Sequence, residues 1–239
     1  HNLYVHNRGR NPRSGNYDDR NPHDEDPNGL LLDFRNNVIY NWGGGHAGYN
    51  ADKASVTRLN YVGNYLVPGP DSSPLGKAYQ EGSTYNRGHF ADNYYDRCRP
   101  DDPWILVRFD GWSARQIAIY KQSKPFETGP IATQEAPDAF RAVLESGGAS
   151  LPRRDAVDQR IVEYVCRGTG RIIKSQIEVG GWPDLQSATA PRDSDNDGMP
   201  DIWEERHGLN PGDAADGPQD EDGDGYTNVE DYLNGLAQG

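Results

Sequence analysis

Three arginines flank one proline in the segment N-R-G-R-N-P-R-S-G near the N-terminus. Like charges repel, so Arg8, Arg10 and Arg13 can lie this close only if they point into water or if an anionic group lies between them. The segment therefore indicates one of two things. It is either a solvated turn whose arginines pair with Asp18 and Asp19, or a site that binds an acid group.

A second set of candidate residues lies near the C-terminus, where carboxylates alternate along two short loops. The segment D-S-D-N-D-G-M-P-D-I-W-E matches the calcium-loop template at positions 1, 3, 5, 6, 9 and 12, and a second copy, D-E-D-G-D-G-Y-T-N-V-E-D, begins 27 residues later. Hard cations prefer oxygen ligands, and the glycine at position 6 permits the sharp turn. The predicted Ca²⁺ ligands are Asp193, Asp195, Asp197, Asp201 and Glu204 in the first loop and Asp220, Asp222, Asp224, Asn228 and Asp231 in the second.

These loops account for the whole net charge of the chain. Residues 193–239 hold 14 of the 37 acidic residues and only one of the 24 basic residues, so this tail alone carries the formal charge of −13. The remainder is neutral, and an arginine cluster there creates a local positive field. The tail resembles thrombospondin type 3 and dockerin-like calcium modules. Its spacing departs from true dockerins, so we expect a structural clip or anchor.

The composition is that of an extracellular β-protein. The chain has 239 residues, a mean hydropathy of −0.93 and many glycines and tyrosines. No apolar run approaches the roughly 18 residues of a membrane helix, so we predict a soluble chain with no membrane or nucleic-acid partner. It begins at His1, without Met or a signal peptide. We therefore expect a mature or trimmed chain, or a fragment that lacks an N-terminal part.

The cysteines and histidines leave alternatives open. Cys98 and Cys166 are the only cysteines, so they form one disulfide or remain two thiols, at least one of them buried. His6, His46 and His89 are expected to serve as structural hydrogen-bond partners rather than as catalytic groups.

Three short strand-like segments must position the arginine cluster. Each places an asparagine before a β-branched and aromatic run, and aligning Asn2, Asn37 and Asn64 gives spacings of 35 and 27 residues. Spacings of this size are typical of stacked solenoid coils. Asparagine tolerates left-handed turns, and stacked asparagine side chains can bond to one another. An all-β fold, a parallel β-helix with a polar loop over residues 14–29, is therefore predicted.

The later part of the chain is less regular. Residues 104–109 are strand-like, and with residues 114–120 they suggest an antiparallel excursion or irregular coils. Apolar residues share one face in 136–144 and in 154–162, which predicts two short helices. The glycines and proline of residues 179–184 begin a linker ahead of the tail.

The first 185 residues resemble polysaccharide lyase family 1, the pectate lyases. The segments H-N-L-Y-V-H-N-R-G-R-N-P-R, D-F-R-N-N-V-I-Y-N-W-G and R-L-N-Y-V-G-N-Y-L-V-P-G-P look like its later coils. The segments G-A-S-L-P-R-R-D-A-V-D-Q-R-I-V, G-T-G-R-I-I and E-V-G-G-W-P resemble the C-terminal region of bacterial members. The resemblance implies a right-handed parallel β-helix in residues 1–185, followed by a separate calcium-loop module in residues 193–239. It also implies a secreted or periplasmic protein.

The family cleaves de-esterified polygalacturonate by β-elimination, and its motif R-x-P-x-x-R matches here at Arg10 and Pro12. The second arginine of the motif falls on Gly15. The resemblance implies that Arg10 is the base that abstracts the C5 proton of a galacturonate. Arg13 and Arg35 are then candidates for binding substrate carboxylates. A base role requires a desolvated and locally positive setting, because a guanidinium ordinarily keeps its proton.

The resemblance further implies a calcium ion that bridges the substrate carboxylate and stabilises the developing enediolate. In the family the acidic ligands of this ion lie on coils before the arginine motif, so we expect a C-terminal part that lacks them. An exposed end coil is an unpaired sheet edge, which predicts a separate N-terminal chain or self-association. The alternative function is a non-catalytic extracellular β-helix with a carbohydrate-binding or structural role.

Overall fold

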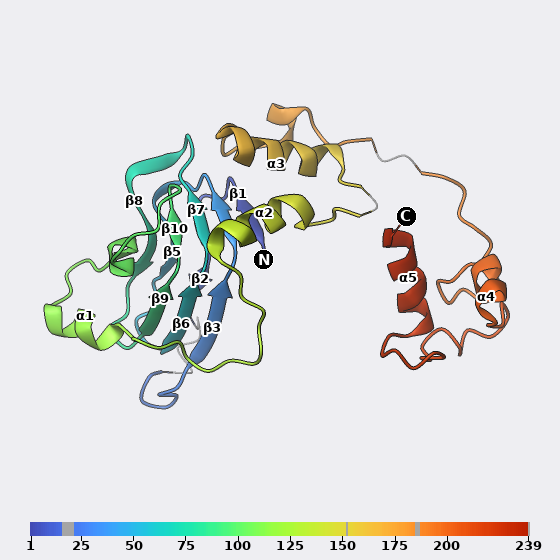
Figure 1. The fold of residues 1–239 in the computed structure, drawn as a ribbon, viewed down its shortest axis with the longest axis horizontal. Coiled ribbons are helices and arrows are strands. Elements are labelled where there is room, and N and C mark those ends of the chain that lie inside the picture. Colours follow the sequence, from blue (N-terminus) through green and yellow to red (C-terminus); the bar gives the residue numbers. More distant parts are fainter. Residues whose placement is uncertain (16–21, 152, 185–186, 239) are drawn as a thin grey trace. The chain divides into compact units, whose positions relative to one another are not determined.

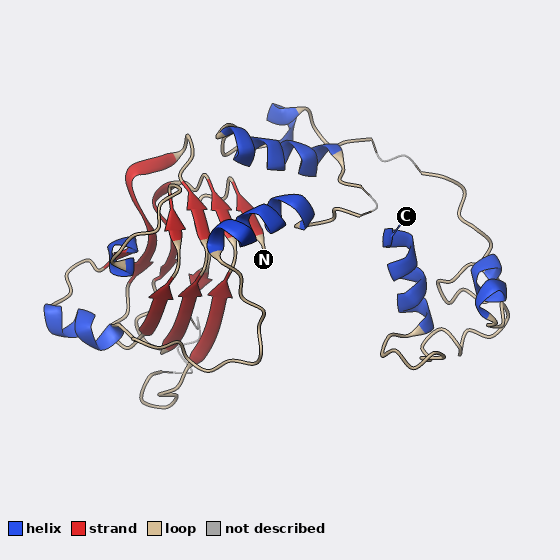
Figure 2. Ribbon diagram, viewed as in Figure 1, coloured by secondary structure: helices blue, strands red, loops and turns tan. Residues whose placement is uncertain are grey.

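A computed structural model describes residues 1–15, 22–151, 153–184 and 187–238 (Figure 1). The chain divides into two units. The strand unit comprises His1–Gly148 and Ala156–Gly181, and the tail unit comprises the described residues of 149–155 and those from Trp182 onward. Figure 2 shows that the described strands all belong to the strand unit, whereas the tail unit consists of loops and the helices α4 and α5.

The described elements of the strand unit are eleven short strands and a few helices. The strands are β1 (Leu3–Val5), β2 (Arg13–Ser14), β3 (Leu30–Arg35), β4 (Val38–Tyr40), β5 (Gly44–Asn50), β6 (Thr57–Val62), β7 (Tyr65–Val67), β8 (Ser72–Glu81), β9 (Arg87–Ala91), β10 (Tyr94–Tyr95) and β11 (Val107–Arg108). The helices are η1 (Pro103–Leu106), α1 (Ala114–Tyr120), α2 (Ala136–Ser146), α3 (Ala156–Arg167) and η2 (Gln176–Val179). The tail unit has α4 (Asp201–His207) and α5 (Asn228–Gln238).

The chain visits three sheets in turn. Sheet A has the order β1-β4-β7-β10, sheet B the order β11-β8-β5-β2 and sheet C the order β3-β6-β9. Every pairing between these strands is parallel, so each circuit of the chain adds one strand to each sheet. Such a course is compatible with the predicted parallel β-helix. The first three strands each lie at the edge of their sheet.

A ladder of asparagines precedes the strands of sheet A. Asn2, Asn37 and Asn64 each donate their backbone N–H and their side-chain amide to the side-chain oxygen of the next asparagine, at 2.8–3.1 Å. The ladder ends at Asn93, a fourth member that the sequence repeat did not include. Buried amides are costly unless they are hydrogen-bonded, so this stacking fixes the register of sheet A. The predicted stacking of the asparagines is confirmed.

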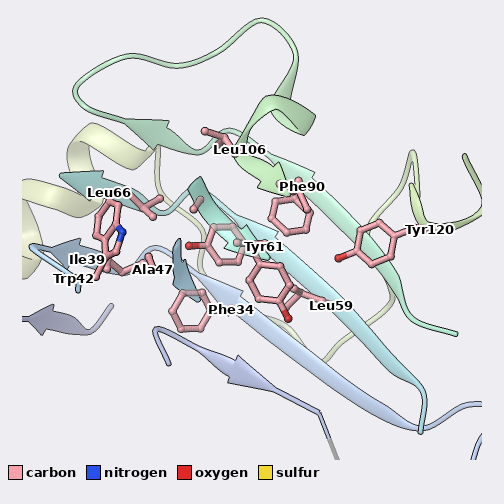
Figure 3. Close-up of a cluster of buried hydrophobic side chains, with 13 residues drawn as sticks. Phe34, Ile39, Trp42, Ala47, Leu59, Tyr61, Leu66, Phe90, Leu106 and Tyr120 are labelled. Atoms are coloured by element: carbon pink, nitrogen blue, oxygen red, sulfur yellow. The ribbon is translucent and has the colours of Figure 1, made fainter. Parts of the chain in front are cut away.

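The core between the sheets contains a stack of aromatic rings (Figure 3). Phe34, Tyr61 and Phe90 occupy the same register position in the three strands of sheet C, and their ring centroids lie 5.3 and 4.9 Å apart. Ile39 and Leu66 of sheet A and Tyr79 of sheet B belong to the same buried cluster. Aromatic stacking adds to the hydrophobic gain of burial, which accounts for an aromatic residue at each level.

Helices cover the outer face of sheet A. Val38 and Tyr40 of β4 point away from the aromatic core and pack against Val143 of α2 and Val165 of α3. Both faces of β4 are therefore buried, which explains its run of three apolar residues without polar alternation. None of the helices among the described residues is both long and apolar enough to cross a bilayer.

The predictions for the later segments were partly wrong. Residues 104–109, expected to be a strand, form η1 and the two-residue β11, because Asp102 caps a turn that begins at Pro103. Residues 114–120, expected to belong to an antiparallel excursion or to irregular coils, form a helix. The side chain of Ser113 accepts from the N–H of Gln116, whose side chain accepts from the N–H of Ser113, and this capping box starts α1. The helix expected at 136–144 is confirmed as α2, and that expected at 154–162 begins two residues later as α3.

The cysteines form no disulfide. Cys98 and Cys166 are both exposed and unpaired, so the expectation that at least one thiol would be buried was also wrong.

Candidate functional site

The arginine segment runs from sheet A to sheet B, between β1 and β2. Asn11 is buried and anchors it, because its backbone N–H and its side-chain amide both donate to the carbonyl oxygen of Ala47, at 3.1 and 3.3 Å. Arg10 has a left-handed backbone with a φ of 69° and an exposed side chain. This conformation is uncommon outside glycine and clusters at functional sites. The segment thus presents Arg10 at the surface from a firmly anchored turn.

A glycine in β5 makes this anchoring possible. A side chain at Gly48 would begin 2.7–2.9 Å from backbone atoms of Asn11 and Pro12. Backbone atoms cannot give way as a flexible side chain can, so the close approach of the segment to sheet B requires glycine at this position.

An open cavity of about 760 Å³ lies beside the segment. Arg8 and Arg10 line it, together with His46 and Tyr49 of β5 and Ile172 from the stretch that follows α3. No aspartate or glutamate is among its lining residues in the described part of the chain. Two guanidinium groups, with no carboxylate in the described lining and Asp71 in the adjoining cavity that shares Arg8, make the cavity suited to an anion.

Two smaller cavities adjoin the first. One, of about 460 Å³, shares Arg8 and Ile172 with it, and the other, of about 430 Å³, shares His46 and Tyr49. The three therefore form a row along one side of the strand unit. A row of open cavities suits an extended chain better than a compact small molecule.

The other predicted arginines lie outside the main cavity. Arg13 lies on β2 with its guanidinium carbon 5.3 Å from the centre of the Tyr49 ring. Arg35 lies on β3 of sheet C and donates to both carboxylate oxygens of Asp33, each at 2.7 Å, and to the hydroxyl of Thr133 at 2.9 Å. The structure thus brings Arg8 and Arg10 together at the cavity, in the connection between sheets A and B. Arg35 lies elsewhere, on sheet C. Asp18 and Asp19, the alternative partners of the arginines, lie outside the described residues.

A hydrogen-bond network fixes the far wall of the cavity. The side-chain amide of Asn41 contacts Nδ1 of His6 at 2.7 Å and donates to Asp71 at 2.8 Å, and the same Asp71 oxygen accepts from the N–H of Ile172 at 2.7 Å. The bond from Ile172, followed by that from Asn41, lowers the pKa of Asp71. Burial lowers the pKa of His6, against the opposing charge of Asp71. Sequence analysis missed this wall, because 101 residues separate Asp71 from Ile172.

His46 belongs to the cavity as a neutral group. Burial lowers its pKa, the charge of Arg108 adds to this effect, and Asp110 opposes it. The structural role expected of histidines is seen at His89, whose Nδ1 contacts the carbonyl oxygen of Gln122 at 3.0 Å. The positive charge of the cavity therefore comes from its arginines.

The two acidic loops of the tail unit share one backbone conformation. In the first loop, the N–H groups of the fourth and sixth residues donate to the two carboxylate oxygens of Asp193, at 2.7 and 3.1 Å. The corresponding N–H groups of the second loop donate to Asp220 at 2.7 and 3.0 Å. The glycine at the sixth position has a φ of 102° in one loop and 98° in the other. Corresponding positions of the two loops thus make the same hydrogen bonds, and the carboxylates converge on the inside of each turn.

The ninth residue closes each loop. Asp201 accepts from the N–H and the hydroxyl of Ser194, at 2.7 and 2.8 Å, and lies 3.2 Å from Arg192. Asn228 accepts from the N–H of Glu221 at 3.3 Å. In this structure both residues bond within the protein, although sequence analysis assigned them to the metal.

Three groups of carboxylates each bring their oxygens within 4.8 Å of one another. One belongs to the first loop, one to the second, and one combines the first loop with a residue that sequence analysis did not single out. Burial and the charges of Asp224, Asp222 and Asp220 raise the pKa of Asp231, which belongs to none of the three groups. Oxygen donors at this spacing fit a hard cation such as Ca²⁺. The groups are Asp193, Asp195 and Asp197; Asp220, Asp222 and Asp224; and Asp197, Glu204 and Asp216.

Comparison with known proteins gives one consistent result. The chain is 32% identical over 222 residues to a protein of Aspergillus terreus named probable pectate lyase C, an alignment that covers 89% of this chain and 47% of the relative. A protein of the same name from Aspergillus fumigatus is 32% identical over 215 residues, covering 88% and 46%. One from Emericella nidulans is 32% identical over 243 residues, covering 98% and 51%. The chain spans about half the length of these relatives, and no family model matches it.

The chain has curated relatives named probable pectate lyase C at about one-third identity along most of its length, which supports a relationship to a pectate lyase family.

Proposed function

We propose that the chain belongs to a polysaccharide lyase that cleaves polygalacturonate, or a related polyuronate, by β-elimination. It would supply the part of the active site that contains the arginines. The observation that carries this proposal is the cavity lined by Arg8 and Arg10, with no carboxylate among its described lining residues. A polyuronate carries a carboxylate on each sugar, so it matches the charge of the arginine cavity and the extended form of the row, although Asp71, Glu81 and Asp110 line the two outer cavities. The name of the curated relatives supports the same substrate class.

In this reaction the C5 proton leaves, the C5–H electrons form a C4=C5 double bond, and the C4–O bond breaks with its electron pair on the leaving oxygen, which takes up a proton from water. We assign Arg8 to binding the uronate carboxylate and Arg10 to the C5 proton. A second guanidinium nearby and a covering polymer are the two features that promote proton loss from an arginine. Arg10 is exposed here, so the bound polymer has to provide the desolvation. Arg13 is proposed as a further carboxylate ligand along the row. Arg35 would serve as one only after releasing Asp33.

The proposal also includes a calcium ion that assists the elimination. Calcium would stabilise negative charge on the substrate carboxylate as the proton leaves. The described lining of the cavity has arginines and no carboxylate, so these residues do not fit a Ca²⁺ ion by themselves.

The same observation favours a second candidate, carbohydrate binding without cleavage. A cationic cavity can hold a polyuronate even if the groups for β-elimination are incomplete. Binding with no cleavage would then be the activity of this chain.

For the fold, we propose a right-handed parallel β-helix over residues 1–185 in a secreted protein, followed by a calcium-loop module over residues 193–239. The edge positions of β1, β2 and β3 support a further proposal, that another polypeptide or a second copy pairs with this end.

For the tail, we propose that Ca²⁺ binds both acidic loops and holds them as a structural clip similar to thrombospondin type 3 modules. The repeated loop conformation supports this proposal. So does Glu204, whose two buried oxygens have no partner within the protein. The donors are the carboxylates of the three groups described above.

The proposal is tested with the full chain, polygalacturonate and added CaCl₂, by the ultraviolet absorbance of the unsaturated product. We expect Arg10→Ala to reduce the rate about a thousandfold, the order of magnitude of general base catalysis. Arg141→Ala is the control, because this arginine lies on α2, pairs with Asp138 and is not among the described lining residues of the cavity. The control variant should cleave at the rate of the unsubstituted protein.

Activity that survives Arg10→Ala overturns the role of Arg10. If the unsubstituted chain binds polygalacturonate without cleaving it, carbohydrate binding replaces the lyase proposal. If it neither binds nor cleaves, both proposals fail.

A further inference from the structure

Glu204 is a fully buried carboxylate with no hydrogen-bond partner. Its side chain on α4 has 0% exposure, and neither carboxylate oxygen is bonded within the protein. Burial, and the charges of Asp195, Asp197 and Asp216 in that order, raise its pKa to about 7. A buried unpaired carboxylate is costly unless a cation accompanies it. Glu204 is therefore an independent sign that a ligand belongs at this position.

Asp216 reaches the same place from a different segment. It lies between the two loops and is 9% exposed. One of its carboxylate oxygens accepts from the N–H of Asn210 at 2.9 Å, whereas the other has no partner. Asp216, Asp197 and Glu204 form one group with carboxylate oxygens within 4.8 Å of one another, and each of the three residues has an oxygen without a partner. Oxygens around one Ca²⁺ ion lie about this far apart, because each metal–oxygen bond is about 2.4 Å long.

The backbone next to Asp216 lies close to the carboxylate of Asp197 because residue 217 is a glycine. A side chain at Gly217 would begin 2.7 Å from a carboxylate oxygen of Asp197. The carbonyl oxygen of Asp216 accepts from the side chain of Asn228 at 2.8 Å, and that of Gly217 accepts from the N–H of Val229 at 3.2 Å. The segment therefore touches the first loop on one side and the start of α5 on the other.

We propose that Asp216 is a ligand of the Ca²⁺ ion of the first loop, so that one ion joins this loop, α4 and the segment that leads into the second loop. This inference rests on the proposed calcium binding of the tail. It makes the two sites unequal, because the second-loop group is exposed and, among the described residues, no buried carboxylate joins it. The first site binds more tightly, and its ion holds the Asp216 carbonyl oxygen that accepts from Asn228 at the start of α5.

Calorimetric titration of the chelator-treated full chain with CaCl₂ tests the inference. The unsubstituted protein should show a tight and a weak class of site. Asp216→Asn keeps an oxygen for the N–H of Asn210 but removes the charge, and we expect at least a tenfold loss of affinity in the tight class. Asp213→Asn is the matched control, since this exposed residue on the same segment belongs to no carboxylate group. Its titration should match that of the unsubstituted protein.

The outcomes separate the two proposals. If the unsubstituted protein binds no Ca²⁺, calcium binding by the tail fails, and the role of Asp216 fails with it. If it binds Ca²⁺ and Asp216→Asn leaves the tight class unchanged, only the role of Asp216 is overturned. A circular dichroism spectrum of Asp216→Asn that differs from that of the unsubstituted protein in chelator would mean that the substitution changes the fold. The calcium titration of Asp216→Glu then tests the role of Asp216. Tight binding by this charge-preserving variant supports ligation, and its absence overturns it.

Discussion

Asn37 accepts two hydrogen bonds from Asn2 at a single side-chain oxygen, from the backbone N–H at 3.1 Å and from the side-chain amide at 2.8 Å. The same pair of bonds recurs at each level of sheet A, so the ladder links neighbouring strands independently of their backbone pairing. It is also the feature that gives the sequence its visible repeat.

Removing one member of the ladder should destabilise the strand unit. Asn64 is fully buried, accepts both bonds from Asn37 and donates to Asn93 and to the carbonyl oxygen of Phe34. Because Asn64→Ala leaves several buried polar groups without partners, we expect a loss of about 2–4 kcal/mol in the free energy of unfolding. Urea denaturation measures it. Asn28→Ala, at an exposed asparagine, should change it by less than about 0.5 kcal/mol, and an equal loss in both variants would contradict the explanation.

Glu81 should make the strand unit less stable as the pH rises. One of its oxygens accepts from the N–H groups of Gly82 and Ser83 and from the amide of Asn86, each at 2.9 Å, yet burial raises its pKa from 4.5 to about 7. The unfolded chain releases this proton near pH 4.5 and the folded chain near pH 7. The contribution of Glu81 to stability is therefore complete below pH 4.5, falls between these values and is constant above pH 7.

Glu81→Gln keeps the accepting oxygen and cannot ionise. Its stability relative to the unsubstituted protein should increase by about 3 kcal/mol between pH 4.5 and pH 8, as measured by urea denaturation. Glu145→Gln, an exposed substitution on α2, is the control and should show no such change. A difference between Glu81→Gln and the unsubstituted protein that does not vary with pH would rule out this titration.

The effect of Glu204→Gln on the melting temperature of the tail unit should change sign when Ca²⁺ is added. In chelator at pH 8 the substitution removes a buried charge that Asp195, Asp197 and Asp216 repel, so the melting temperature of the tail unit should rise by several degrees. With Ca²⁺ present it removes a ligand, and the variant should melt below the unsubstituted protein. Calorimetry under both conditions provides the measurement. Glu205→Gln, at the exposed neighbouring position, should show no reversal.

The two cysteines should react as free thiols. Cys98 and Cys166 are exposed, so an aromatic disulfide reagent should titrate two thiols per folded chain without denaturant. A reducing agent should leave the melting temperature unchanged. Fewer than two reactive thiols, together with a shift in melting temperature on reduction, would indicate a bridge.

The sequence alone was sufficient wherever structure depends on local patterns. The asparagine repeat predicted the strands of sheet A and the bonds between their turns, because each asparagine acts at the turn of its own coil. The alternating carboxylates and the glycine at the sixth position predicted two equal loops, since the bonds that shape each loop join residues at most seven positions apart. The capping box at Ser113 was a local signal as well, and with it α1 was predictable.

Only the tertiary structure decided which distant residues meet. It placed Ile172 on Asp71 as the wall of the arginine cavity and put Arg35 on sheet C, whereas Arg10 lies in the connection between sheets A and B. It also brought Asp216 to Glu204, although Asp216 occupies no position of the loop template. These contacts depend on the number of residues in each circuit of the chain and on the packing of α3 against sheet A. Neither leaves a periodic pattern in the sequence, because burial and hydrogen bonding act between segments that are neighbours only after folding.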